Sequence, residues 1–183
     1  MFTTIFEDGS LQDFILQKTQ DPWIGTPFER YVFMASKTMG EFGESFVSKY
    51  FEIMGSKVER AETSTDGYDR VIDGILTEIK FSLANRAYKK GIAYAKKDQF
   101  MINHLAKGKN WDRVVIFAIN PVFEESHLVW FNKEDFINNV DKGDCGIQKQ
   151  QGGDPADNDD YFCTNNNITK LVQCDWVKSV KEW

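Results

Sequence analysis

Residues 69–80 read DRVIDGILTEIK, and this stretch predicts a β-hairpin. The dipeptide Asp73-Gly74 lies between two short apolar runs, which is typical of a two-residue type I′ turn. Such a turn fixes the pairing of the two strands, so that Ile72 faces Ile75 and each residue farther from the turn has a defined partner. The turn therefore decides which side chains share a face of the sheet.

Continuing this register places Asp69 directly across from Glu78, and Lys80 follows on the same face. The opposite face carries the residues expected to meet the core, Ile72, Ile75, Thr77, Ile79 and Phe81. Like charges directly across a ladder destabilise it, whereas a divalent cation between two carboxylates reverses the sign of the interaction. The hairpin therefore predicts a metal site.

The length of 183 residues suits one domain, spanning residues 1–183, with a sizeable core. No apolar run approaches the roughly 18 residues of a membrane span, and the first residues lack the pattern of a signal peptide. We expect a cytoplasmic protein without a membrane partner. The three cysteines have no CxxC spacing and are expected to be reduced.

Charge is distributed unevenly along the chain. The net charge is −6, which by itself argues against a nucleic-acid partner. Between Arg86 and Arg113, however, eight Lys or Arg residues stand against two Asp, a local net charge of +6 that leaves −12 for the rest. A basic stretch directly after the carboxylates suits a polyanion, and a solvated helix face is the alternative.

The first third of the chain is predicted to be helical, because Thr26-Pro27-Phe28-Glu29 has the pattern of a helix start. Apolar residues recur at helical intervals over 39–54, and Gly55 suits the end of that helix. Glu44 lies at the border of the apolar face, so it is the carboxylate of this helix that could point inward.

The rest of the chain alternates between strand and helix patterns. We expect strands at 57–62, 113–119 and 127–131, the second covered on both faces, and a helix at 134–140. A mainly helical stretch is expected from Phe81 to Gly108, with buried positions at Ile92, Phe100, Met101, Ile102 and Leu105. Residues 142–167 are predicted to form a polar loop, and residues 176–183 to form one helical face. The fold class is α/β, with a mixed central sheet flanked by helices.

Glu78-Ile79-Lys80 is the only Asp/Glu-x-Lys triplet in the chain, and it falls on a strand beside Asp69. Together with the preceding helix, GEFGESFVSKYFEIMG, and the stretch through EIKFS, these residues resemble the PD-(D/E)xK nuclease superfamily. Its members include type II restriction enzymes, Mrr-like enzymes and Holliday-junction resolvases. The resemblance covers roughly residues 38–120 and implies a restriction-endonuclease-like core.

The resemblance assigns the metal ligands to Asp69, Glu78 and the main-chain carbonyl of Ile79, and the catalytic lysine to Lys80. Glu44 matches a helix glutamate that some members use as a further ligand. The proline of the family motif is missing, because Tyr68 precedes Asp69. This departure leaves Asp66 as a rival for the first ligand, with Asp73 a weaker one because the turn needs it.

Each assignment has a structural alternative. Glu78 and Lys80 could form a solvated ion pair, which contributes little to stability. Glu44 could be a surface acid of its helix. Two histidines, His104 and His127, are far apart and lack a zinc spacing, so both are expected to be scaffold or surface residues.

The chemistry of the ligands favours Mg²⁺, which binds one or two carboxylates and keeps several waters, and Mn²⁺ could substitute for it. The implied substrate is double-stranded DNA, cut at a phosphodiester bond. Cutting both strands at a palindrome calls for a homodimer, since each chain carries one site. The residues considered for DNA contacts are Lys96, Lys97, Gln99, Lys149, Gln150, Gln151, Asn165 and Asn166.

The leading hypothesis is a magnesium-dependent type II restriction endonuclease, with the polar loop at 142–167 as its DNA-recognition element. An Mrr-like, repair or junction-resolving nuclease with the same core is the nearest rival. A protein of another class, which binds or mimics DNA without cutting it, is the third hypothesis, and the acidic net charge favours it.

Overall fold

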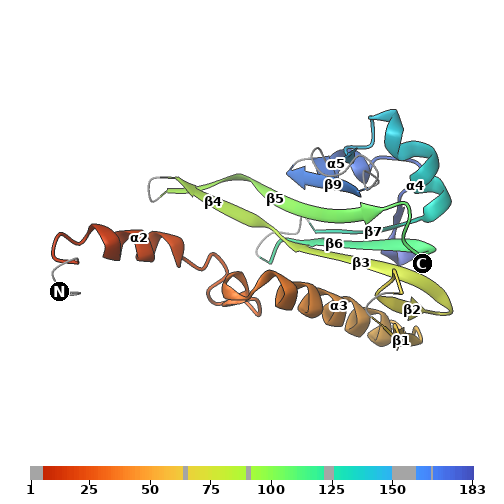
Figure 1. Cartoon of the computed structure of the whole chain (residues 1–183), viewed down its shortest axis with the longest axis horizontal. Coiled ribbons are helices and arrows are strands. Elements are labelled where there is room, and N and C mark those ends of the chain that lie inside the picture. The colour runs from red at the N-terminus through yellow and green to blue at the C-terminus, as the bar shows by residue number, and fades with distance from the viewer. Residues whose placement is uncertain (1–5, 64–65, 90–91, 122–125, 150–159, 166) are drawn as a thin grey trace.

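The computed structural model describes residues 6–63, 66–89, 92–121, 126–149, 160–165 and 167–183, without the side chains of residues 17–18, 85–89, 92–99 and 164–165. Two sheets form its body (Figure 1), one with the strand order β1-β2-β3-β6-β7-β10 and one with the order β4-β5-β9-β8. In chain order the elements are α2 Ser10–Lys18, η1 Tyr31–Phe33, α3 Ser36–Ile53, β1 Val58–Arg60, β2 Arg70–Ile72, β3 Ile75–Leu83, β4 Asn85–Lys89, β5 Ile92–Ala106, β6 Arg113–Ile119, β7 His127–Asn132, α4 Lys133–Asn139, η2 Val140–Lys142, β8 Gln148–Lys149, β9 Asp160–Asn165, α5 Asn167–Leu171, β10 Lys178–Ser179 and η4 Val180–Glu182.

The predicted hairpin is confirmed as β2 and β3. Arg70 faces Thr77 in the observed register. The turn residues Asp73 and Gly74 have φ angles of 52° and 83°, as a type I′ turn requires. Beyond the last ladder pair, the N–H of Asp69 still donates to the carbonyl of Thr77 at 3.0 Å. Asp69 is thus held where β2 begins, one residue outside the ladder.

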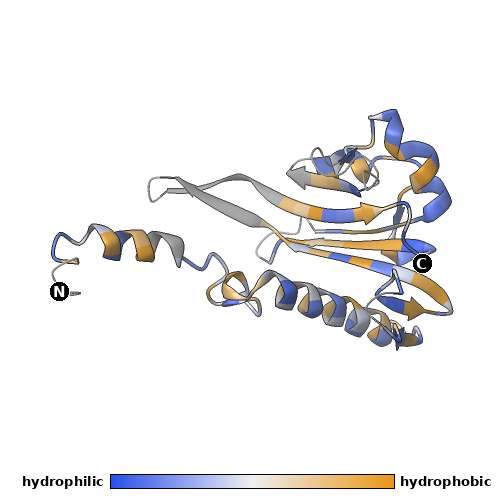
Figure 2. Ribbon diagram, in the orientation of Figure 1, coloured by the Kyte–Doolittle hydropathy of each residue, from blue (hydrophilic) through white to orange (hydrophobic). Residues whose placement is uncertain are grey.

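Strand β6 is covered on both faces, as its apolar sequence predicts. Val114, Ile116 and Ala118 belong to the core cluster shared with β5 and β9, whereas Val115 and Phe117 belong to the cluster beneath α3. Figure 2 shows hydrophobic residues along the central strands of the six-stranded sheet. Because β3 and β6 are parallel and the other pairs of this sheet are antiparallel, the sheet is mixed. The predicted fold class, α/β with a mixed central sheet flanked by helices, is confirmed.

Helix α3 packs on one face of the six-stranded sheet (Figure 1). Its apolar residues Val47 and Phe51 are buried against Ile79 of β3. Gly55 follows with a φ of 93°, which ends the helix in the left-handed conformation that its sequence predicts. The helix approaches β3 closely, because a Cβ at Gly43 would lie 2.4 Å from a side-chain atom of Phe81.

The helix predicted between Phe81 and Gly108 is wrong, because this stretch forms strands β4 and β5. β5 pairs with β4 and then with β9. Phe100, Ile102 and Leu105 are buried as expected, but Met101 is 59% exposed since successive residues of a strand face opposite sides. The pairing strand β9 comes only after the polar segment, so no local pattern indicates it.

The helix predicted to start at Thr26 is also wrong, although Thr26 and Glu29 both accept main-chain hydrogen bonds at this position. Thr26 Oγ1 accepts a hydrogen bond from the N–H of Phe28, and Glu29 Oε2 accepts one from the N–H of Gly25. Arg30 then adopts a φ of 70°, which a right-handed helix does not allow, and only the short η1 follows. The capping residues therefore stabilise a turn.

The C-terminal residues also differ from their prediction. Residues 176–183 form β10, which pairs with β7, and the 3₁₀ turn η4 instead of one helical face. The polar segment 142–167 contains β8 and β9, and its residues 150–159 and 166 lie outside the described part. Among the described helices, none has both the length and the apolar character needed to cross a bilayer.

Candidate active site

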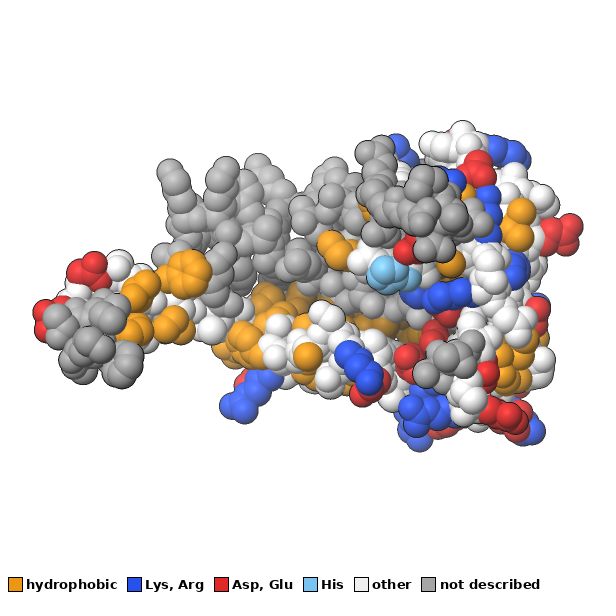
Figure 3. Space-filling view, in the orientation of Figure 1, with side chains coloured by type: hydrophobic (Ala, Val, Ile, Leu, Met, Phe, Trp, Pro, Cys, Tyr) orange, Lys and Arg blue, Asp and Glu red, His pale blue; other side chains and the backbone are white. Residues whose placement is uncertain are grey.

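A groove of about 720 Å³ lies between the α3–β3 side of the molecule and strand β5. Its polar and charged lining includes Glu44, Asp69, Glu78, Lys80, His104 and Lys109. Figure 3 shows acidic, basic and histidine side chains gathered on the face where this side and the β5 layer meet. The groove therefore brings the sequence-predicted carboxylates and lysine together with two residues that the sequence analysis did not place in a site.

Asp69 stands at the start of β2 and reaches across to β3, where its Oδ2 accepts the N–H of Ile79 at 2.7 Å. Burial, and then the negative charge of Glu78, raise the pKa of Asp69 from 3.8 to about 6. The hydrogen bond from Ile79 and the charge of Lys80 act in the opposite direction but are weaker than these two causes. A cation bound in the groove would therefore stabilise the ionised form of Asp69.

Glu78 is 2% exposed, and its Oε1 accepts hydrogen bonds from two ammonium groups. Lys80 Nζ lies 2.7 Å away and comes from the same strand face, as the alternation along β3 predicts. Lys109 Nζ lies 2.8 Å away and comes from the turn between β5 and β6. The two ammonium groups stabilise the buried charge of Glu78, because an unpaired buried charge is costly.

Lys109 is one of the two groove residues that the sequence analysis did not place in a site, since it appears in the sequence only as one of many basic residues. Its turn is held from two sides. Lys133 Nζ donates to the carbonyl of Lys109, and Gly67 packs so closely that an added Cβ would lie 2.6 Å from the N of Asn110. No local sequence pattern indicates these contacts, because Gly67 and Lys133 lie in segments distant from Lys109 in the chain.

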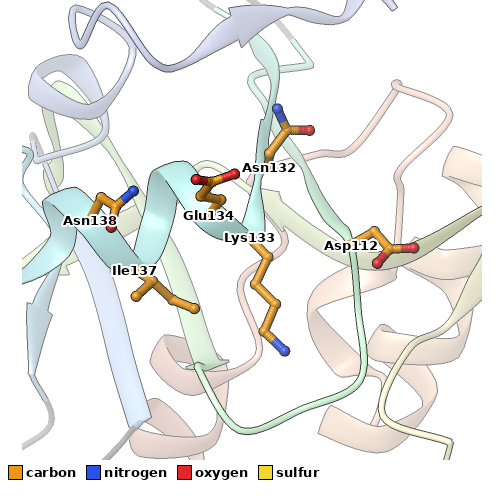
Figure 4. A pocket seen from close by; sticks show the side chains of 6 residues that line it. All are labelled: Asp112, Asn132, Lys133, Glu134, Ile137 and Asn138. Carbon is orange, nitrogen blue, oxygen red and sulfur yellow. The ribbon is translucent and has the colours of Figure 1, made fainter.

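A second hollow, of about 430 Å³, lies beside this turn at the start of α4 (Figure 4). It is lined by Asp112, Asn132, Lys133, Glu134, Ile137 and Asn138. Asp112 accepts a hydrogen bond from the N–H of Leu76, and Lys133 is engaged with Lys109 as described above. Both charged groups therefore make contacts next to the turn that carries Lys109.

Glu44 lines the groove from α3, and it is partly buried. Its Oε2 accepts a hydrogen bond at 3.0 Å from Nη1 of Arg70, which is only 8% exposed. The same guanidinium donates to Ser48 Oγ at 2.9 Å and to the carbonyl of Asp69 at 2.7 Å. Arg70 thus joins α3 to the residue that carries the first candidate ligand.

The two rival ligands lie elsewhere. Asp66 accepts hydrogen bonds from the N–H and the hydroxyl of Thr63, at 2.8 and 2.5 Å, and these bonds lower its pKa. Asp73 accepts the N–H of Lys57 at 2.8 Å beside its own turn. Neither residue lines the groove, whereas Asp69 does. The geometry therefore favours Asp69 over Asp66 and Asp73.

The residues considered for DNA contacts are only partly described. Lys96, Lys97 and Gln99 lie on strand β5, and not on the helix in which the sequence analysis placed them. Lys149 ends β8 and is exposed. Gln150, Gln151 and Asn166 lie outside the described residues, and Asn165 ends β9.

The donor set of the groove fits a hard divalent cation that keeps waters of its own. In the described part of the chain, no group of three or more His, Cys, Asp or Glu side chains is arranged to hold a metal ion. Asp69 and Glu78 supply two carboxylates side by side, and each engages one oxygen in the hydrogen bonds given above. Two carboxylates suit Mg²⁺, which needs no closed protein cage, and do not suit a structural zinc site.

Comparison with known proteins gives one kind of match. No family model and no curated protein matches the chain. Among solved structures, the chain is similar to a bacterial homing endonuclease, I-Ssp6803I, with 15% sequence identity and a TM-score of 0.40. The match covers 57% of this chain and 74% of that one. A likeness at this level says nothing about activity, so the function is derived from the groove alone.

Proposed function

We propose that the chain is a magnesium-dependent endonuclease that hydrolyses phosphodiester bonds in double-stranded DNA. The observation that supports this proposal is the placement of Asp69 and Glu78 in one groove, with the ammonium groups of Lys80 and Lys109 both within 2.8 Å of Glu78. Two carboxylates attract a cation, and two lysines attract a phosphate. A groove with both suits an anionic substrate that must meet a metal.

Asp69, Glu78 and the carbonyl of Ile79 would hold the ion. When bound, Mg²⁺ would supply Lewis-acid stabilisation of the phosphate and a more acidic water. Lys80, whose side chain is 16% exposed, is held against Glu78 and would orient the attacking water. Lys109 is 37% exposed and would face the phosphate oxygens, where its charge offsets the charge that develops during attack.

The finer proposal is a type II restriction enzyme that acts as a homodimer, with residues 1–183 forming one nuclease domain. Phosphate contacts position a protein on DNA without specifying sequence, so base contacts have to come from outside the carboxylate groove. The segment 142–167 is our candidate, with Lys149 exposed at the end of β8. Two-fold symmetry would present one groove to each strand of a palindrome.

A plasmid digest tests the proposal. We expect the wild-type protein to cut supercoiled plasmid in the presence of Mg²⁺ or Mn²⁺ and not in EDTA. Glu78→Gln and Lys80→Ala should each lower the rate by about 100-fold or more, since the first weakens a metal ligand and the second removes the group that would orient the attacking water. Glu41→Gln is the matched control, because Glu41 is an exposed acid on the same helix as Glu44.

The pattern of products separates the nuclease hypotheses. Discrete bands from linear DNA support a restriction enzyme, whereas nicks at junctions or flaps support a repair or junction-resolving nuclease. Cleavage that survives both Glu78→Gln and Lys80→Ala rejects this groove as the active site.

A non-catalytic DNA-binding or DNA-mimic protein is the second candidate. Two observations favour it: both lysines already pair with Glu78, and the chain carries a net charge of −6. Such a protein would bind DNA, or inhibit a DNA-binding enzyme, without cutting any DNA in Mg²⁺ or Mn²⁺. Fluorescence anisotropy with labelled duplex, run beside the digest, distinguishes this candidate from a nuclease.

A further inference from the structure

His104 has a backbone conformation that side chains rarely adopt. Its φ is 59°, in the left-handed region, and it is one of three described non-glycine residues with a positive φ. It lies in β5 at the irregularity between Ile102 and Leu105, where the register with β9 shifts. A bulge of this kind redirects one side chain away from the regular alternation, and bulges and strained residues gather at functional sites.

The imidazole of His104 is held by a carboxylate. Its Nδ1 lies 2.7 Å from Oδ2 of Asp160, the first residue of β9. The other oxygen of Asp160 is buried and has no hydrogen-bond partner within the described residues. A carboxylate accepts but does not donate, so Asp160 fixes the proton on Nδ1 and leaves Nε2 for another contact.

The side chain of His104 is 68% exposed and lines the same groove as Asp69 and Glu78. It belongs to β5, whereas the carboxylates belong to the β2–β3 hairpin on the opposite side of the groove. The lining of the groove includes residues of both sides, so a polyanion lying in it can reach His104 and the carboxylates. The imidazole and the carboxylates thus line one groove from different strands.

We propose that His104, oriented by Asp160, contacts the nucleic-acid strand in the groove by donating a hydrogen bond from Nε2–H to a phosphate oxygen. This inference rests on the proposed nucleic-acid substrate but not on cleavage. A phosphate is an acceptor, so the contact uses the ring with a proton on each nitrogen, Nδ1–H facing Asp160 and Nε2–H donating to the phosphate. This contact accounts for the bulge at His104, which a histidine with only a scaffold role would not require.

DNA binding, measured without cleavage, tests the contact. Fluorescence anisotropy of a labelled duplex in Ca²⁺ is compared for wild type, His104→Asn, His104→Lys and Asp160→Asn. Asn tolerates a positive φ, so His104→Asn removes the imidazole without added strain, and thermal unfolding should be unchanged. We expect His104→Asn to weaken binding about tenfold and to lower the slope of log affinity against log salt by about 1.

The other variants separate a phosphate contact from a structural role. His104→Lys places a cation at the same position and should keep the affinity within about threefold of wild type. Asp160→Asn should weaken binding less than His104→Asn, because the ring remains but is no longer fixed. Lys49→Ala, which removes an exposed cation of α3 that does not line the groove, should change nothing.

Two outcomes would overturn the proposal. Equal affinity and equal salt slope for wild type and His104→Asn would do so even if the plasmid digest shows a nuclease. Absence of measurable association of the wild-type protein with duplex would overturn it as well. Binding that depends on His104 without any cleavage in Mg²⁺ would instead sustain the contact and reject the nuclease proposal.

Discussion

Oδ2 of Asp69 accepts the main-chain N–H of Ile79 at 2.7 Å, so a side chain at the start of β2 is bonded to the backbone of β3 just beyond the hairpin ladder. This bond holds the Asp69 carboxyl beside Glu78, the neighbour of Ile79 in the sequence. The cost is visible at Asp69 itself, because burial and the charge of Glu78 raise its pKa to about 6. A cation bound between Asp69 and Glu78 would therefore relieve their repulsion.

The raised pKa predicts how stability depends on pH. An Asp with a folded-state pKa of about 6 binds more protons in the folded than in the unfolded protein between about pH 4 and pH 6. The free energy of unfolding in EDTA should therefore fall as the pH rises through this window, by about 1–3 kcal/mol from this group. Asp69→Asn should remove the fall and be more stable than wild type at pH 7, as urea denaturation at several pH values would show.

Asp66→Asn is the contrasting control for this profile. Hydrogen bonds from Thr63 lower the pKa of Asp66, so its contribution is present at neutral pH and lost as the pH falls. This variant should be less stable than wild type at pH 7, the opposite sign to Asp69→Asn. A wild-type profile that matches Asp69→Asn between pH 4 and 6 would show that Asp69 is not the strained carboxyl.

Among the cationic residues of the β2–β3 hairpin, Arg70 is the one whose substitution is predicted to destabilise the protein most. Its guanidinium is buried and bonds Ser48, Glu44 and the carbonyl of Asp69. Arg70→Ala leaves Glu44 without its partner and should lower the free energy of unfolding by about 2–4 kcal/mol, as removal of one member of a buried pair does.

Lys49→Ala is the surface control for Arg70. The Lys49–Glu52 pair has side chains 71% and 49% exposed, and its loss should change stability by less than about 0.5 kcal/mol. Urea denaturation of both variants measures the difference. Similar small effects for both would mean that Arg70 does not hold α3 to the hairpin.

Two glycines of the same helix should respond in opposite ways to a methyl group. A Cβ at Gly43 would lie 2.4 Å from Cβ of Phe81, whereas a Cβ at Gly40 would have no neighbour within 4 Å. Gly43→Ala should cost about 1–3 kcal/mol through overpacking, and Gly40→Ala should stabilise α3 by about 0.5–1 kcal/mol. Thermal unfolding of the two variants measures both, and a stable Gly43→Ala protein would contradict the close packing of α3 on β3.

The sequence predicts the parts of the fold that depend on neighbours in the chain. Asp73-Gly74 determines a local turn, and from that turn the register of the hairpin and the meeting of Asp69, Glu78 and Lys80 follow. The continuous apolar run of β6 likewise indicates a strand with two covered faces, which the division of Val115 and Ile116 between two cores confirms.

The parts that depend on distant segments are not predicted. Residues from Phe81 to Gly108 have too few regularly spaced apolar residues to distinguish helix from strand, and the strand β9 that pairs with β5 lies far along the chain. Lys109 reaches Glu78 from a turn that Lys133 and Gly67, in two other segments, contact. The position of His104 depends on a bulge, for which the sequence gives no signal.

Metal binding is the measurement that tests the central claim most directly. Titration of the protein with Mn²⁺, followed by water-proton relaxation or calorimetry, should show binding that competes with Mg²⁺ and weakens at least about tenfold in both Asp69→Asn and Glu78→Gln. Asp66→Asn should bind as wild type does. Unchanged Mn²⁺ binding in Asp69→Asn and Glu78→Gln would contradict the account, since the two carboxylates would then hold no cation.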